Sequence, residues 1–194
     1  IDIESKSDGG WVVSWMPNDY QLGVQILEFS SEGNSSDGGS SANSYAVVTN
    51  PQIEYFPDGD KVIVYEGMSA DSDHFGILAQ LIAVDGSNIG SEILVNTYFT
   101  GAQRQPVTCI SESGNWLVVW ASMDQDGSGN GIYAQLFDRD GEKLGEEFKV
   151  NTFTSGDQGH WNSGKGHEAT ALENGDFFVT WECFGTKSAK GANR

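Results

Sequence analysis

Four segments of the chain carry apolar side chains at nearly every position, each beginning after a glycine and ending at Trp or Tyr. With that glycine included, they run over residues 9–15, 59–65, 114–120 and 175–181. In the third segment, Trp116, Val118 and Trp120 would point to one face of a strand, with Leu117 and Val119 on the other. A strand exposed on one face alternates polar and apolar residues. These segments therefore predict strands that are buried between two sheets.

The four apolar segments are parts of a longer repeat. Their terminal aromatic residues are separated by 50 (65 − 15), 55 (120 − 65) and 61 (181 − 120) positions. Residues 65–103 align with residues 120–158 without a gap, and 16 of the 39 pairs are identical. A fixed period of this size predicts repeated supersecondary units that pack against one another.

Each unit reads as four short strands separated by turn-forming residues. In the best-preserved unit the predicted strands cover 106–111, 115–121, 131–138 and 147–152. No segment keeps a helical period, so helix is not expected. The prediction is an all-β, β-propeller-like array of four-stranded blades, with three full units and half of a fourth. A stacked β-sandwich is an alternative, whereas a right-handed β-helix would need much shorter coils.

The repeat divides the chain into four expected units. Unit 1 is divergent and contains a low-complexity loop at 30–44, and unit 3 contains an inserted loop at 159–168. The predicted boundaries are 1–50 for unit 1, 51–105 for unit 2, 106–167 for unit 3 and 168–194 for the first half of unit 4.

Charge and composition limit the partners. The formal net charge is −18 and the sequence pI is about 4.2, so nucleic acid and anionic membrane surfaces would repel the chain. No apolar run is long enough to span a bilayer, and no membrane insertion is expected. An acidic, Gly- and Ser-rich chain is typical of extracellular or cell-surface proteins.

One long motif resembles a known repeat family. Residues 124–138 read DQDGSGNGIYAQLFD, followed by GEEFKVNT at 145–152 and GDQ at 156–158. This resembles the tandem "GIYAQ…FxVNT…GxQ" units of large secreted or surface proteins of bacteria and ciliates. In the bacterial proteins these units accompany haemolysin-type or cadherin-like modules. The resemblance implies an extracellular, propeller-like array with no established catalytic role.

Oxygen-bearing side chains recur in the loop between the second and third strands. Asp124, Asp126 and Asn130 offer carboxylate and amide oxygens on a Gly-rich loop, which suits Ca²⁺. Asp71 and Asp73 occupy the corresponding loop of unit 2. The alternative is an Asx-type turn, in which these carboxylates cap backbone N–H groups.

The inserted loop of unit 3 is the second candidate site. It contains Trp161 between polar residues, with His160 and His167 nearby. An exposed aromatic ring can stack on a sugar, so these three residues are the predicted ligand-binding set. A packing role for Trp161 is the alternative.

Two features leave alternatives open. Asn34 stands in an Asn-x-Ser/Thr sequon, which predicts either a glycosylated or an unmodified exposed loop. Cys109 and Cys183 fall in neighbouring units and could form a disulfide or remain separate thiols.

The sequence contains none of the common local signatures of hydrolases or nucleotide-binding enzymes. The predicted function is therefore a non-enzymatic structural or adhesive repeat protein, part of a larger polypeptide or of a multi-subunit assembly such as a filament. Its partners would be other copies or other subunits bound through exposed sheet edges. The alternatives are a carbohydrate-binding, lectin-like propeller, with or without Ca²⁺, and a glycoside-active enzyme.

Overall fold

The computed structural model describes residues 1–6, 8–15, 17, 24–35, 40–41, 48–68, 75–159 and 166–184. These residues form strands, turns and bends only, so the all-β prediction is confirmed for the described part of the chain.

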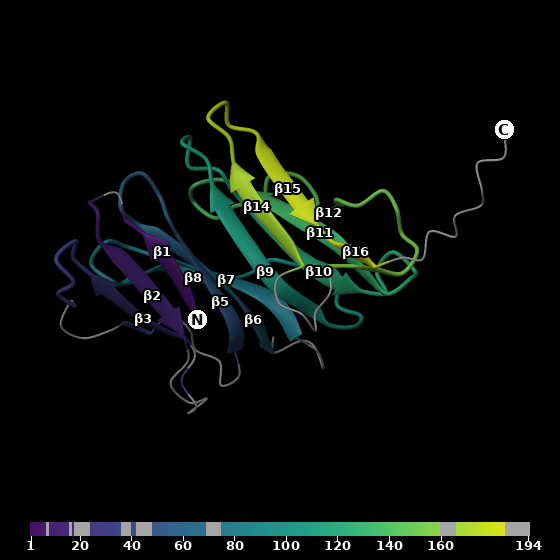
Figure 1. The fold of residues 1–194 in the computed structure, drawn as a ribbon, viewed down its shortest axis with the longest axis horizontal. Helices are drawn as coiled ribbons and strands as arrows, with labels where there is room; N and C mark the ends of the chain where they lie inside the picture. Colours follow the sequence, from purple (N-terminus) through teal and green to yellow (C-terminus); the bar gives the residue numbers. More distant parts are fainter. Residues whose placement is uncertain are drawn as a thin grey trace.

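Three four-stranded antiparallel sheets follow one another along the chain (Figure 1). The first contains β1 (Asp2–Ser5), β2 (Trp11–Trp15), β3 (Gln25–Phe29) and β4 (Ser40–Ser41). The second contains β5 (Val48–Tyr55), β6 (Lys61–Met68), β7 (Phe75–Ile82) and β8 (Asn88–Leu94). The third contains β9 (Gln103–Ile110), β10 (Trp116–Met123), β11 (Asn130–Phe137) and β12 (Phe148–Lys149).

Two smaller sheets complete the described structure. One pairs β14 (His167–Ala171) with β15 (Phe177–Trp181), and the other pairs β13 (Asp157–Gln158) with β16 (Cys183–Phe184). The first strands of successive sheets, β1, β5, β9 and β14, lie side by side in an arc (Figure 1). The sheets therefore succeed one another around a common inner side.

The turns between the first and second strands repeat closely. In the turn before β6, Gly59 donates its N–H to the Phe56 carbonyl at 2.9 Å and has a φ of 92°. Gly114 holds the same place before β10, with a φ of 86°. A left-handed backbone at these positions favours glycine, which explains why each apolar segment begins after a Gly.

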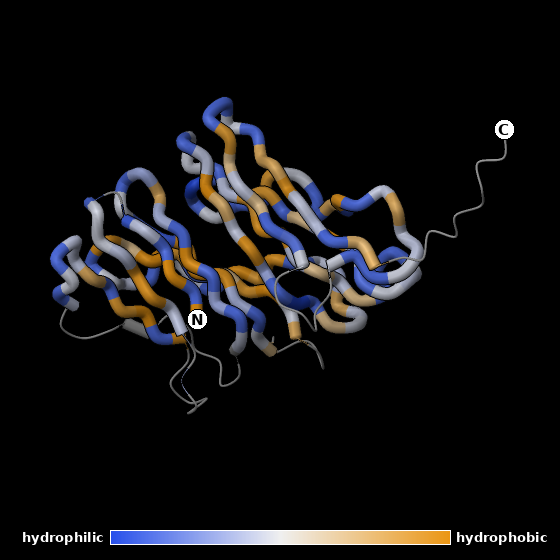
Figure 2. The backbone as a smooth tube through the Cα atoms, viewed as in Figure 1, coloured by the Kyte–Doolittle hydropathy of each residue, from blue (hydrophilic) through white to orange (hydrophobic). Residues whose placement is uncertain are grey.

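Strands β6 and β10 are buried along seven of their eight residues. Trp120 and Tyr65 are fully buried, as the sequence predicts for a strand sandwiched between sheets. Figure 2 shows hydrophobic residues along the central strands and hydrophilic residues at the turns. The same prediction is wrong for β15, where Phe178 is 55% and Trp181 is 39% exposed, because the described residues place only β14 beside it.

The hydrophobic cores lie between sheets of neighbouring units. One core joins Val62 and Ile77 of the second sheet to Trp116 and Phe137 of the third, whose rings stack with their centroids 4.1 Å apart. A second core joins the first and second sheets, and a third joins the third sheet to β14 and β15. Each pair of neighbouring units thus shares one core.

Candidate functional site

The residues that recur in every well-preserved unit are internal hydrogen-bond clamps. The Asn of each Val-Asn-Thr motif accepts a backbone hydrogen bond through its Oδ1. Asn96 accepts the N–H of Ile77 and Asn151 accepts the N–H of Ile132, both at 2.8 Å. Its Nδ2 also donates to a backbone carbonyl two residues further on, again at 2.8 Å. Both Asn side chains are almost completely buried, so this part of the signature serves the fold.

The repeated glutamines act in the same way. Gln80 and Gln135 each donate Nε2 to the next residue's carbonyl and to a carbonyl nine or ten residues on. Gln103 and Gln158 each donate to two carbonyls of the loop that precedes them. Because the shared residues are committed to the backbone, a functional site is expected where the units differ.

The clearest difference between units lies at residue 61. The corresponding positions of the other units hold Trp11 (61 − 50), Trp116 (61 + 55) and Phe177 (116 + 61), whereas unit 2 has Lys61. This lysine is only 2% exposed. A buried ammonium group requires an anionic or hydrogen-bonding partner, so Lys61 indicates a polar site inside an apolar framework.

Lys61 reaches into a groove of about 470 Å³ at the turns that follow β1, β5 and β9. We call it the ion-pair groove. Its lining comes from the first strands and first turns of three units, together with the ends of β3 and β7. The lining residues are Glu4, Ser5, Lys6, Asp8, Glu28, Glu54, Tyr55, Phe56, Pro57, Gly59, Lys61, Val84, Ile110, Ser111 and Glu112.

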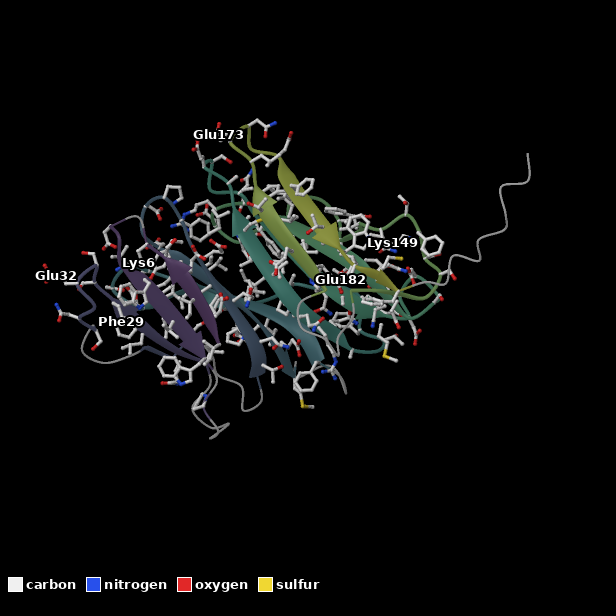
Figure 3. The ribbon with its side chains drawn as sticks, viewed as in Figure 1. Lys6, Phe29, Glu32, Lys149, Glu173 and Glu182 are labelled. Atoms are coloured by element: carbon white, nitrogen blue, oxygen red, sulfur yellow. The ribbon has the colours of Figure 1, made fainter. Side chains whose placement is uncertain are left out.

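Glu28 is the centre of the charge pairing in this groove. Its Oε1 lies 2.8 Å from the Lys61 Nζ, and its Oε2 lies 3.1 Å from the Lys6 Nζ. Figure 3 shows Lys6 at the turn end of the first sheet. Partial burial opposes ionisation of Glu28, but the hydrogen bonds and charges of the two lysines outweigh it and hold its pKa below the usual value.

Tyr55 contributes an aromatic face and a hydroxyl group to the same wall. The Lys61 ammonium lies 5.6 Å from the centroid of its ring. Burial, and then the negative charge of Glu28, raise the pKa of the Tyr55 hydroxyl well above its ordinary value. Tyr55 therefore stays protonated at neutral pH and can donate a hydrogen bond.

Two further carboxylates face the groove from matching positions. Glu4 on β1 and Glu54 on β5 are 50 residues apart (54 − 4), which is the spacing of units 1 and 2. Both are half-buried and line the groove. With the lysines and Tyr55, they give a surface that can donate and accept many hydrogen bonds while an aromatic ring lies beside them.

A buried carboxylate, Glu66, lies near the other end of the second sheet. It is 1% exposed and accepts hydrogen bonds from Thr49 Oγ1 at 2.8 Å, Asn50 Nδ2 at 2.6 Å and the Gln105 N–H at 2.6 Å. Asn50 and Gln105 occupy equivalent positions (105 − 55) and have positive φ values of 50° and 55°. Glu66 thus holds the start of β5 and the start of β9 together.

The predicted Ca²⁺ ligands of unit 3 are engaged with backbone N–H groups. Asp126 Oδ1 accepts the Ser128 N–H, and Asp124 Oδ1 accepts the Gly129 N–H, both at 3.2 Å. The Asn130 N–H donates to Asp157 Oδ1 at 3.0 Å. Within the described ranges, no three His, Cys, Asp or Glu side chains are grouped closely enough to hold a metal ion. Ca²⁺ binding here stays a prediction.

The other predicted site residues have different outcomes. Asp71, Asp73, His160 and Trp161 lie outside the described residues. His167 begins β14 and is 2% exposed, so it is a buried residue at the start of a strand rather than part of an open loop.

Three remaining predicted positions lie on described segments. Asn34 is exposed in a turn, where its carbonyl accepts the Ser30 N–H, and its glycosylation stays a prediction. Cys109 and Cys183 are free thiols. Burial, together with the charge of Glu54, raises the pKa of the Cys109 thiol to about 12.

Comparison with known proteins gives structural matches only. No protein-family model matches the chain, and no curated protein is similar to it in sequence. The endo-arabinase from Bacteroides thetaiotaomicron superposes with a TM-score of 0.56 at 14% identity, covering 92% of this chain and 67% of that enzyme. A GH43 endo-arabinanase from Bacillus licheniformis gives 0.54 at 15% identity, covering 97% of this chain and 67% of that enzyme.

A third match extends the same pattern. The α-L-arabinofuranosidase from Lactobacillus brevis gives a TM-score of 0.53 at 12% identity, covering 77% of this chain and 52% of that enzyme. The chain therefore spans about half to two thirds of the length of these proteins. At such low identities the likeness shows a shared fold.

These matches correct the prediction of a non-enzymatic structural or adhesive protein that assembles into filaments. These solved structures, which share the fold, are glycoside-acting enzymes, so the predicted structural role and the prediction of a non-enzymatic protein were wrong. The error has a physical origin, because the prediction relied on repeated residues that only clamp the backbone. The unit-specific Lys61 in an apolar strand was the available signal for a site.

The search for membrane spans among the described residues finds no helix that is long and apolar enough to cross a bilayer.

Proposed function

We propose that the chain forms successive blades of an extracellular β-propeller that binds and hydrolyses a polysaccharide, with the ion-pair groove as its saccharide site. The observation that carries the proposal is the convergence of three units on one groove containing buried, charged and aromatic side chains. The fold shared with arabinan- and arabinofuranoside-acting enzymes supports this reaction class. The side-by-side arrangement of β1, β5, β9 and β14 supports the propeller.

The chemistry of the groove suits a hydroxyl-rich ligand. Sugar hydroxyls both donate and accept hydrogen bonds, and the groove provides carboxylates, ammonium groups and a protonated phenol within about 470 Å³. The Tyr55 and Phe56 side chains supply apolar surface for the C–H face of a sugar ring.

The carboxylates of the groove divide into two classes. Asp8 accepts the Gly10 N–H at 2.9 Å, and Glu28 is paired with two lysines. The hydrogen bond from Gly10 lowers the pKa of Asp8, and the lysines lower that of Glu28, so neither group is suited to donate a proton near neutral pH. Glu4 and Glu54 are the remaining carboxylates from the first strands, and we assign the acid and base roles to this pair.

Two measurements test the proposal. Calorimetric titration with arabinan and xylan oligosaccharides measures binding, and release of reducing ends measures hydrolysis. Glu54→Gln and Glu4→Gln should lower the rate of hydrolysis by about a hundredfold or more while preserving the fold. Glu32→Gln is the matched control, because Glu32 is exposed and lies at the outer margin of the first sheet (Figure 3).

The outcomes separate three cases. Hydrolysis that is lost in the two groove variants and kept in the control supports the proposal. Binding without hydrolysis would reduce the function to glycan recognition. A wild-type chain that binds none of these saccharides would refute the assignment of the groove.

A further inference from the structure

An arginine of unit 3 reaches the turn that forms one wall of the ion-pair groove. Arg139 lies in the turn after β11, and both Asp58 and Asp60 lie in the turn between β5 and β6. The Arg139 Nη2 is 2.8 Å from Asp58 Oδ2 and 2.5 Å from Asp60 Oδ2, and its Nε donates to Asp58 Oδ2 at 3.2 Å. Its guanidinium carbon lies 4.0 Å from the centroid of the Phe56 ring. A single side chain thus holds this turn from the neighbouring unit.

The same turn carries two of the groove's polar residues at its base. Tyr55 ends β5 and Lys61 begins β6, and the two are register partners across the turn. Phe56, which packs under the Arg139 guanidinium, also lines the groove. A shift of the turn would therefore move the Lys61 ammonium relative to Glu28, its partner at 2.8 Å.

Each of the two aspartates has a separate task for each of its oxygens. Asp58 Oδ1 accepts the Asp60 N–H at 3.2 Å, and Asp60 Oδ1 accepts the Val84 N–H at 2.9 Å. Both Oδ2 atoms bind Arg139 instead. The carboxylates therefore bond to unit 2 with one oxygen and tie it to unit 3 with the other.

This arrangement departs from the repeat. The position of Arg139 holds Val84 in unit 2 (139 − 55), and the two aspartate positions hold Ser113 and Asn115 in unit 3 (58 + 55 and 60 + 55). The turn of unit 3 nevertheless has the same two backbone hydrogen bonds, at 2.8 and 2.9 Å. The turn does not need these carboxylates to form. Like Lys61, they are a departure from the repeat that falls beside the ion-pair groove.

We propose that Arg139 is a positioning residue of the ion-pair groove. It fixes the turn between β5 and β6, so that Tyr55 and Lys61 keep their places beside the saccharide. Ion pairs that are open to solvent add little to the free energy of folding, whereas a planar guanidinium bound to two carboxylates fixes direction. The role toward the saccharide rests on the function proposed above, but the effect on the turn can be measured without a ligand.

Arg104 offers a matched control, because it bridges the same two sheets away from the groove. Its Nη1 lies 4.0 Å from Glu66 Oε2, and its guanidinium carbon lies 5.3 Å from the centroid of the Phe75 ring. Arg104 does not line the ion-pair groove. Arg104→Ala therefore removes an ion pair and an arginine–aromatic contact between the second and third sheets without touching the turn.

Hydrogen exchange followed by mass spectrometry measures the turn in the absence of ligand. In Arg139→Ala the amides of residues 56–61 should exchange about tenfold faster, and the Lys61 amine should react faster with an acylating reagent. Arg104→Ala should match the wild type in both measurements. Arg139→Lys keeps the charge but not the planar fork, so it should restore only part of the protection.

A second variant tests the same contact from the other side. Asp58→Asn with Asp60→Asn removes both charges and keeps the Oδ1 acceptors inside unit 2, and it should loosen the turn as Arg139→Ala does. Combining this double variant with Arg139→Ala should add no further increase in exchange, because the three groups act as one unit.

Kinetics with arabinan or xylan oligosaccharides test the role toward the saccharide. Arg139→Ala should raise KM about tenfold and change kcat by less than about twofold, because the turn presents binding groups while Glu54 lies within β5. A mere loss of folded protein would instead lower the apparent kcat and leave KM unchanged.

Wild-type exchange and labelling in Arg139→Ala would overturn the proposal, as would an equal increase in Arg104→Ala. A turn that loosens in Arg139→Ala while KM keeps its wild-type value would overturn it too, because the turn would then not position the saccharide. A wild-type chain that binds none of these saccharides would refute the function proposed for the groove. The exchange and labelling measurements would then still decide whether Arg139 positions Lys61.

Discussion

Two tryptophans at equivalent positions should differ strongly in their contribution to stability. Trp120 is fully buried between the second and third sheets, whereas Trp181 at the same position of β15 is 39% exposed. Replacing a large buried aromatic residue with alanine costs about 3–5 kcal/mol, because both apolar contact and packing are lost. We expect this cost for Trp120→Ala.

The exposure of Trp181 sets the expected difference. A tryptophan buries up to about 250 Å², so 39% exposure leaves roughly 100 Å² in water, worth about 2.5 kcal/mol at 25 cal/mol per Å². Trp181→Ala should therefore cost only about 1–2 kcal/mol. For a chain of this size, each kcal/mol lowers the melting temperature by roughly 2–4 °C.

Urea unfolding followed by circular dichroism measures both variants against the wild type, with the slope of the transition checking that the unfolded states are comparable. Equal losses for the two variants would refute the reasoning, because they would show that Trp181 is as well packed as Trp120. A small loss for Trp120→Ala would refute the buried position of the second strand.

Three further results are expected. The pKa of Glu28 lies below the ordinary glutamate value of 4.5, so its ion pairs stabilise the fold above that pH and this stabilisation is lost as the pH falls further. In an acid titration, the free energy of unfolding should therefore decrease less for Glu28→Gln than for the wild type. Ca²⁺ at millimolar concentration should raise the melting temperature of the wild type but not of Asp126→Asn, and no change in the wild type would remove the calcium prediction. With a thiol reagent at pH 8, exposed Cys183 should react rapidly, whereas buried Cys109 should react only on unfolding. The pKa of Cys109 is raised to about 12, so its reactive thiolate form is scarce at pH 8. Equal reaction rates would contradict the burial of Cys109.

The sequence predicts the strand framework well because its signals are local. Doubly apolar segments ending at Tyr65 and Trp120 correctly mark buried second strands, and Gly114 correctly marks the turn between first and second strands. The fourth predicted strand of unit 3 is longer than β12, which covers only Phe148–Lys149. Strand length at a sheet edge depends on pairing partners, which the periodic pattern does not contain.

The candidate site was harder to predict because its members come from distant parts of the chain. Glu28, Tyr55 and Lys61 belong to three strands, and only the packing of units 1 and 2 brings them together. The acidic composition also hides Glu4 and Glu54 among many other carboxylates. The two loops that the sequence favoured are conspicuous in composition, whereas one lysine inside an apolar strand is a weaker signal.

The location of the hydrophobic cores between units has a consequence for how such a chain can change during evolution. Duplicating one unit keeps both of its existing interfaces and adds a single new one, between the unit and its copy, so the chain can lengthen in steps. Deleting an interior unit instead brings together two faces that never packed before. Unit 2 is constrained on both faces, because Lys61 and Tyr65 face unit 1 while Val62 and Val64 face unit 3.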